Sequence, residues 1–196
     1  VGNFVGKEAT GAVGASSLLF TCIIGLFTGV SIGVGVAVAQ KIGSKDYDMA
    51  SKVSHTAITF GIFGGIILTI LGYFSAEFLL TIMKTPKEIM NDSVIYLKVY
   101  FLSMLPMILY NIGAGIIRST GNSKTPFYIL IIGGITNVLA NYFFIVILKK
   151  GVLGVAIATT LSQTLTALIV LTYLFKNKTI IKFKTSELKI DFSLLR

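Results

Sequence analysis

Long apolar runs, separated by short polar segments, make up most of this chain. Five of the runs reach the length of about 20 residues that an α-helix needs to cross the hydrocarbon core of a bilayer. The expected helices cover residues of about 10–40, 53–80, 93–118, 125–148 and 151–175. Strands of a membrane barrel would be about ten residues long and would alternate in polarity, and these runs do neither. The pattern predicts an all-α, polytopic bundle of transmembrane helices.

The composition strengthens this prediction. Apolar residues form 54% of the 196 residues and charged residues only 13%, and the mean hydropathy is +0.86. Soluble domains carry about 25% charged residues. The chain therefore has too few charges to cover a surface that faces water, and we expect a multi-pass protein of the cell membrane.

The net charge of +9 is compatible with a nucleic-acid partner, but the placement of the charges argues against one. The basic residues lie in the connections between apolar runs. The richer set of connections comprises Lys41–Lys52, Arg118–Lys124 and the tail 176–196, so the positive-inside rule makes these segments cytoplasmic. The tail is then a cytoplasmic linker or, alternatively, an anionic-lipid site. The N-terminus falls outside, and we expect a further helix before Val1.

A few uncharged polar residues interrupt the apolar runs and are the candidate functional residues. Asn137 and Asn141 share one helix face, and Thr159, Ser162, Gln163 and Thr166 form one stripe on the last helix. Asn111 lies on the third helix. Such groups either hydrogen-bond between helices or line a hydrated cavity. Their number favours a substrate or ion cavity lined by Asn111, Asn137, Asn141, Thr159 and Gln163.

Two further patterns concern packing and bending. Gly25, Gly29 and Gly33 share one face of the first helix, where a neighbouring helix could approach closely. Pro106 lies mid-way along the third helix, where its missing N–H favours a kink, and we consider it a candidate hinge.

The chemistry that an enzyme needs is missing from the helix cores. No Asp or Glu lies within them, Cys22 is the only cysteine, and no phosphate loop or metal cluster is recognisable. The sequence therefore predicts no catalytic residue, no metal site and no cofactor.

Four segments resemble one known family. In order along the chain they are Val1–Gly6 with Ala12–Gly14, Ala39–Gly43, Arg118–Pro126 and Gly151–Thr159. This arrangement is similar to that of the MATE (multidrug and toxic compound extrusion) family. The resemblance implies twelve helices in two six-helix lobes around a central cavity. Residues 1–175 would be helices two to six of the first lobe, and 176–196 the linker toward a second lobe that the chain lacks, as it lacks the first helix.

The resemblance also implies a coupling site. Many members combine an Asp on helix one with an Asn and an Asp four residues apart on helix five and a Thr on helix six. Asn137 matches that Asn and Thr159 that Thr, while Asn141 stands where those members have Asp. Other members carry Asn followed by an aromatic residue there, as in Asn141–Tyr142.

The function so implied is secondary active export of amphipathic, often cationic drugs or toxins, coupled to H⁺ or Na⁺ and driven by alternating access. The partners would be these small molecules, the lipid bilayer and the remaining parts of the same protein. Two alternatives remain open. One is a flippase for lipid-linked oligosaccharides, whose cavity should be basic. The other is a membrane scaffold without transport activity.

Overall fold

The computed structural model describes the backbone of residues 7–176 and the side chains from Thr21 onward. This part of the chain is helical from end to end: α2 (Lys7–Gly43), α3 (Tyr47–Ile82), α4 (Lys87–Phe101), α5 (Met104–Ser119), α6 (Lys124–Asn141), the π-helix η1 (Tyr142–Ile147) and α7 (Gly151–Lys176). The all-α prediction is confirmed. Residues 177–196, which hold almost all of the expected linker, lie outside the described residues.

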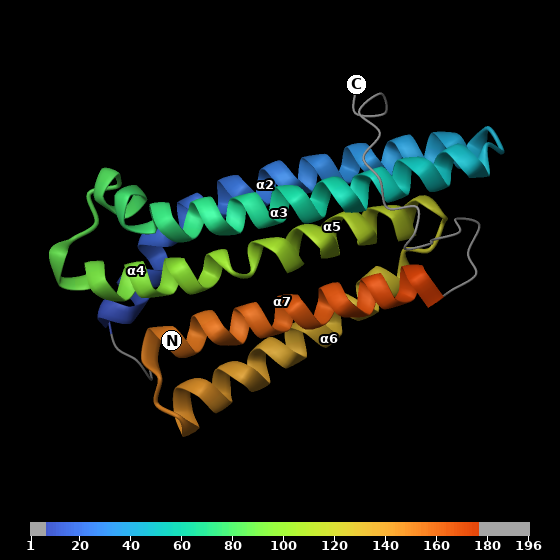
Figure 1. Cartoon of the computed structure of the whole chain (residues 1–196). Helices are drawn as coiled ribbons and strands as arrows, with labels where there is room; N and C mark the ends of the chain where they lie inside the picture. Colours follow the sequence, from blue (N-terminus) through green and yellow to red (C-terminus); the bar gives the residue numbers. More distant parts are fainter. Residues whose placement is uncertain (1–6, 177–196) are drawn as a thin grey trace.

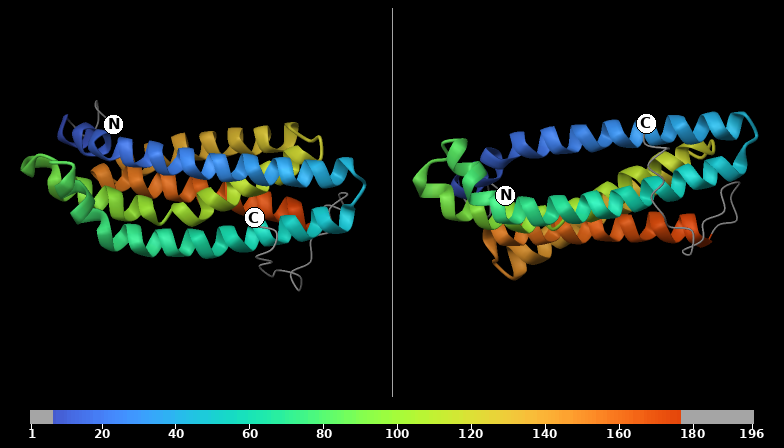
Figure 2. Two further views of the ribbon diagram at one scale, coloured as in Figure 1. Left: turned by 90° about the horizontal axis from the view of Figure 1, so that it is seen from above. Right: turned by 45° about the horizontal axis from the view of Figure 1, so that its top comes forward.

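The membrane spans follow the apolar runs. Within the described residues, Thr21–Gly43, Tyr47–Ile82, Lys124–Ile147 and Gly151–Lys176 are each long and apolar enough to cross a bilayer. A fifth span arises when α4 and α5 are taken together. The helices run roughly alongside one another in an elongated bundle (Figures 1 and 2). Helix α5 lies between the α2–α3 hairpin and α7, while α6 packs mainly on α7 at the outer side of the bundle.

Short polar turns connect the spans. Asp46 caps α3, since its carboxylate accepts a hydrogen bond from the backbone N–H of Met49 at 3.1 Å. Helix α5 ends before Gly121, which has a φ of +85°. That left-handed conformation suits glycine and ends many helices, because no Cβ obstructs it.

The third expected span, 93–118, is not one straight helix. It begins earlier, at Lys87, and is broken at Leu102–Ser103 with a bend of 43° between α4 and α5. Pro106 lies one turn beyond the break and has no N–H to donate to the carbonyl of Leu102, while its ring crowds that carbonyl. The expected kink is therefore present, and its use as a hinge stays a prediction.

Glycines let α3 approach this bent span. A Cβ at Gly65 would lie 2.9 Å from the Cα of Leu105, and one at Gly61 would lie 2.7 Å from Cδ1 of Ile112. A Cβ at Gly72 would collide with the ring of Phe101. The backbone of α3 therefore packs on side chains of both α4 and α5, one on each side of the bend. In this way α3 supports the bent shape of the α4–α5 pair.

No described helix packs closely on Gly25, Gly29 and Gly33, so the close packing expected there stays a prediction. All three are exposed, and no described atom lies within 4 Å of a Cβ built at any of them. The opposite side of α2 packs instead: Phe27, Ser31 and Val38 are buried there. Periodicity shows which residues share a helix face, but it does not show which face meets a neighbour.

The outer surface of the bundle is strongly apolar. Large side chains are exposed along one side of α3 and of α6, among them Phe63, Phe74, Phe78, Val138 and Leu139. A water-soluble protein of this size rarely exposes such extended apolar surface. Lipid tails cover such faces in a membrane protein.

Candidate polar cavity between helices α5, α6 and α7

One cavity gathers several polar residues from three helices. Its volume is about 520 Å³. It lies where α5, α6 and α7 meet, with one contribution from α2. The lining residues are Ile24, Met107, Tyr110, Asn111, Leu130, Gly133, Gly134, Asn137, Thr159, Ser162, Gln163 and Thr166. We call this space the polar cavity.

Four of the five residues expected to form a substrate or ion cavity line this space. Asn111, Asn137, Thr159 and Gln163 come from three different helices and meet there. Asn141 is not among the lining residues but lies one helical turn from Asn137 and contacts it. The structure thus brings the five together, and their role in binding stays a prediction.

A chain of hydrogen bonds links these residues across the α6–α7 contact. The side-chain amide of Asn141 donates to Asn137, and the amide of Asn137 donates to Oγ of Ser162 at 3.3 Å. Ser162 in turn donates to the backbone carbonyl of Thr159 at 2.9 Å. Each amide is therefore held by a neighbour, which fixes the polar face of α6 toward α7.

Close packing of α6 on α7 depends on Gly133. A Cβ at this position would collide with Cγ2 of Thr166, a residue that lines the same cavity. At the far end of this helix pair, Gly154 packs on the backbone of Phe144 in the π-helix η1, where an added Cβ would lie 3.2 Å from the Phe144 carbonyl oxygen. The two glycines hold the helices close on either side of the amide network.

The serine and threonine hydroxyls of the cavity donate within their own helix. Thr159 Oγ1 donates to the carbonyl of Val155 at 3.0 Å, and Thr166 Oγ1 donates to that of Gln163 at 2.9 Å. Back-bonding of this kind satisfies the hydroxyl hydrogen. The hydroxyl oxygens still have lone pairs, so they can act as acceptors toward water or a cation.

Asn141 has an unsatisfied acceptor. Its Oδ1 atom is buried and has no hydrogen-bond partner in the described part of the chain. Buried amide oxygens are nearly always hydrogen-bonded, and an exception calls for a water, an ion or another partner. This oxygen lies beside the polar cavity, because the nitrogen of the same amide group binds Asn137.

Helix α5 is held against α2 next to the cavity. Ser31 Oγ donates to the backbone carbonyl of Asn111, and a Cβ at Gly115 would lie 2.8 Å from both Oγ and the carbonyl oxygen of Ser31. The side chain of Asn111 donates to the carbonyl of Met107 at 2.9 Å. The position of Asn111 in the cavity therefore depends on this contact between α2 and α5.

The polar cavity carries no formal charge among its described residues. Its polar groups are the amides of Asn111, Asn137 and Gln163, the hydroxyls of Thr159, Ser162 and Thr166, and the phenol of Tyr110. The described residues contain no group of His, Cys, Asp or Glu able to hold a metal ion. The described lining can offer a ligand hydrogen bonds and apolar contact, but no ionic partner.

Three polar lining residues, Tyr110, Ser162 and Thr166, are absent from the set of cavity residues predicted from the sequence. Ser162 and Thr166 belong to the polar stripe on α7, so the helical spacing alone could have included them. Tyr110 has no such signal, since an aromatic residue in a membrane helix is common. Its hydroxyl donates to the carbonyl of Pro126 at 3.3 Å and links α5 to the start of α6.

Comparison with known proteins places these features in a family context. The sequence profile of the MatE family matches residues 1–143. A probable multidrug resistance protein of Bacillus subtilis (strain 168), YoeA, is 33% identical over 202 residues, which cover 100% of this chain and 44% of that protein.

Solved structures of a multidrug resistance MATE family transporter of the MOP superfamily are also similar. One in the outward-facing conformation has a TM-score of 0.91 at 27% identity, covering 97% of this chain and 43% of that chain. One in the inward-facing conformation has a TM-score of 0.90 at 26% identity, and the match covers 96% of this chain and 43% of that chain. The chain thus spans somewhat less than half the length of these relatives.

Proposed function

Because this chain belongs to the MatE family of transporters, we propose that it forms one lobe of a multidrug efflux protein. The proposed activity is antiport: amphipathic, cationic small molecules leave the cell while H⁺ or Na⁺ enters. The two lobes would alternate access to a central cavity by moving against each other.

The polar cavity is the observation that carries this proposal. A membrane helix bundle gains nothing from amides inside the bilayer unless these groups find partners or water. Here three helices direct such groups to one space of about 520 Å³. That volume suits a small molecule, and the mixture of apolar walls with a few polar groups is typical of ligand sites.

The comparisons support movement of the lobe as a unit. The same chain matches an outward-facing and an inward-facing structure almost equally well, with TM-scores of 0.91 and 0.90. A lobe that repacked during transport would resemble one state much more than the other. Rigid-body motion of a preformed lobe is therefore the simplest mechanism for alternating access.

The amide pair on α6 is the proposed cation-linked element of this lobe. The unpartnered Oδ1 of Asn141 and the lone pairs of Thr159 supply neutral oxygen ligands, which suit Na⁺ or a hydrated cation. Neither residue titrates. We therefore propose that H⁺ coupling, if used, requires a carboxylate from another part of the protein.

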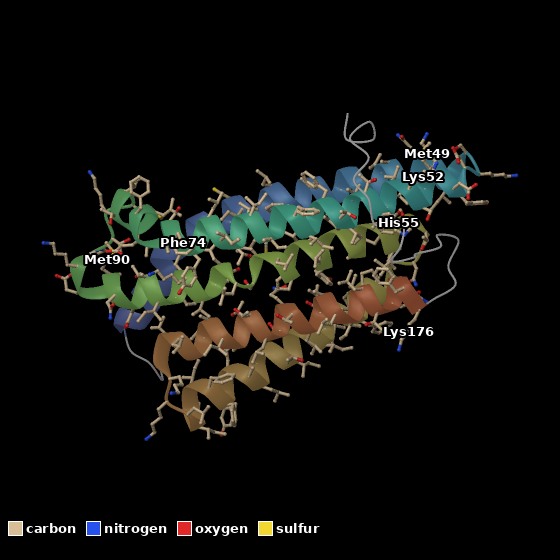
Figure 3. All side chains as sticks on the ribbon, viewed as in Figure 1. Met49, Lys52, His55, Phe74, Met90 and Lys176 are labelled. Carbon is tan, nitrogen blue, oxygen red and sulfur yellow. The ribbon has the colours of Figure 1, made fainter. Side chains whose placement is uncertain are left out.

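The proposed location is the cell membrane, with Lys41, Lys45, Lys52, Arg118, Lys124 and Lys176 at the cytoplasmic end. Lys52 and Lys176 lie at the same end of the bundle, opposite Met90 (Figure 3). The charge distribution favours this orientation by the positive-inside rule.

Ethidium retention tests the proposal. The full-length gene is expressed in a host that lacks its own efflux pumps, and cellular ethidium is followed by fluorescence over time. We expect faster loss of ethidium than in cells with the empty vector, and slower loss when the Na⁺ and proton gradients are collapsed. Unchanged retention across a broad panel of cationic drugs would count against drug export.

The flippase alternative makes a different demand on the cavity. A pyrophosphate needs basic side chains, and the described lining of the polar cavity contains no Lys or Arg. A scaffold without transport activity would in turn need no hydrated space. The described lining thus favours drug export over both.

A further inference from the structure

A second cavity lies on α7, outside the polar cavity. Its volume is about 470 Å³, and the described residues that line it are Leu168, Ile169, Thr172, Tyr173 and Lys176. These residues extend over about 12 Å along the helix. Apolar side chains come first, two hydroxyls follow and a lysine lies at the end, so polarity increases steadily toward Lys176.

The loop between α5 and α6 reaches the polar end of this groove. The side-chain amide of Asn122 donates to the hydroxyl of Tyr173 at 2.9 Å and to Oγ1 of Thr125 at 2.8 Å. Asn122 also accepts a hydrogen bond from the backbone N–H of Thr125 at 3.1 Å. The loop is thereby fixed in position against the last turns of α7.

Two more basic residues flank this contact. Arg118 precedes Asn122 by four residues and Lys124 follows it by two, and both are exposed. With Lys176 they form what we call the basic rim. Neither residues 118–128 nor residues 168–176 contain an Asp or Glu, whereas Asp46 and Asp48 lie at the start of α3. The rim therefore has a local excess of positive charge at the membrane boundary.

We propose that this groove and the basic rim bind an anionic phospholipid of the cytoplasmic leaflet. One acyl chain lies along Leu168 and Ile169, and the phosphate lies among Arg118, Lys124 and Lys176. Tyr173 supplies a further contact: its oxygen accepts from Asn122, so its O–H is available to donate to a phosphate or ester oxygen.

Charge complementarity selects this occupant. Basic residues next to a membrane helix attract anionic lipids, and basic pockets between helices on the cytoplasmic side bind their headgroups. A soluble phosphate would use the rim but not the apolar part of the groove, which Leu168 and Ile169 form. Zwitterionic lipids would use the apolar part and gain little from three positive charges.

The test uses the full-length protein and native mass spectrometry. The protein is released from mixed vesicles of phosphatidylglycerol and phosphatidylcholine, and the retained lipids are counted. We expect retention of phosphatidylglycerol in preference to phosphatidylcholine. The triple variant R118Q/K124Q/K176Q should bind phosphatidylglycerol roughly a hundred-fold more weakly, since each basic residue near an anionic surface contributes about a five-fold effect.

A matched triple variant provides the control. Lys87, Lys149 and Lys150 are exposed residues of the opposite set of connections, and K87Q/K149Q/K150Q changes the net charge by the same amount. This control should retain phosphatidylglycerol as the unmodified protein does. Equal losses in both triple variants would overturn the proposal, because they would show a response to net charge alone.

A second pair of variants tests the contribution of the apolar groove separately from that of the basic rim. Leu168→Asn should weaken phosphatidylglycerol retention, while Leu130→Asn in the polar cavity should leave it unchanged. Displacement of the lipid by inorganic phosphate at low concentration would overturn the assignment to a lipid. The inference does not depend on transport. Asn137→Ala should lower ethidium efflux about ten-fold or more and keep phosphatidylglycerol bound, and loss of both would contradict two separate sites.

Discussion

The side-chain nitrogen of Asn141 donates hydrogen bonds to two oxygens of Asn137, the backbone carbonyl at 2.9 Å and the carboxamide Oδ1 at 3.0 Å. The two residues lie one turn apart near the end of α6, immediately before the π-helix η1. Asn137 thus occupies the centre of the amide network, since it accepts from Asn141 and donates to Ser162 on α7.

Removal of this central amide should affect transport strongly. Asn137→Ala removes one of the two acceptors of the Asn141 amide and the donor to Ser162 Oγ. Each lost hydrogen bond costs about 0.5–1.5 kcal/mol. We expect the ethidium efflux rate to fall about ten-fold or more. Asn91→Ala, at an exposed position of α4, is the control and should keep full efflux at equal protein abundance. Normal efflux by Asn137→Ala would remove the network from the mechanism.

Two adjacent glycines of α3 should respond oppositely to alanine. At Gly65 an added Cβ would lie 2.9 Å from the Cα of Leu105, a backbone atom that cannot move at low cost, whereas at Gly64 no neighbouring atom of the described residues lies within 4 Å. We expect Gly65→Ala to destabilise the protein by about 1–3 kcal/mol. Gly64→Ala should be neutral or stabilising by up to about 1 kcal/mol, because alanine favours helix. Thermal unfolding in detergent measures both, and equal midpoints would contradict the packing described between α3 and α5.

The bend between α4 and α5 should relax without Pro106. Pro106→Ala restores an N–H that can bond to the carbonyl of Leu102. Spin labels at Lys87 and Arg118, near the two ends of the pair, should then move apart by roughly 3 Å, as the 43° bend and the helix lengths require. If the bend serves as a hinge, efflux should fall while thermal stability is kept. An unchanged distance would assign the bend to the packing of α3 instead.

The hydrogen bond between Asn122 and Tyr173 should make the effects of substituting the two residues on the free energy of unfolding non-additive. A double-mutant cycle with Asn122→Ala and Tyr173→Phe isolates this hydrogen bond of 2.9 Å. We expect a coupling free energy of about 1 kcal/mol in thermal unfolding. Tyr128→Phe, at an exposed position on α6, replaces Tyr173→Phe in the control cycle and should show no coupling. Strictly additive effects in the first cycle would show that the loop is not held by this bond.

Much of the fold could be predicted from the sequence because a bilayer imposes strong rules. Each span must be long, apolar and internally hydrogen-bonded, so the five runs could be read directly. Pro106 predicted a kink in this span, but the sequence could not give its angle of 43°. The π-helix after Asn141 could not be foreseen, since the sequence does not show that Phe144 of η1 packs on Gly154 of α7.

The candidate site could be predicted only in part, because helical spacing shows which residues share a face but not how the helices are rotated. The stripe on α7 and the pair on α6 share faces by helical spacing, and the polar cavity brings these faces together with Asn111. Spacing could not show that Asn141 would lie outside the cavity lining and donate its amide hydrogen bonds to Asn137. Nor could it show that Gly35, rather than Gly33, would face Gly115 on α5. Such details depend on how each helix is rotated against its neighbours.

Water access to the polar cavity is the most direct test of this account. Cys22 is first replaced by serine, and single cysteines are then placed at Asn137, Thr159 and Val138. A membrane-impermeant thiol reagent is applied from outside to intact cells, and from either side to membrane vesicles. Asn137 and Thr159 belong to the described lining of the cavity, whereas Val138 is exposed on the apolar outer side of α6. The account predicts labelling at Asn137 and Thr159 and none at Val138. Labelling of Val138 alone, or of none of the three, would contradict it.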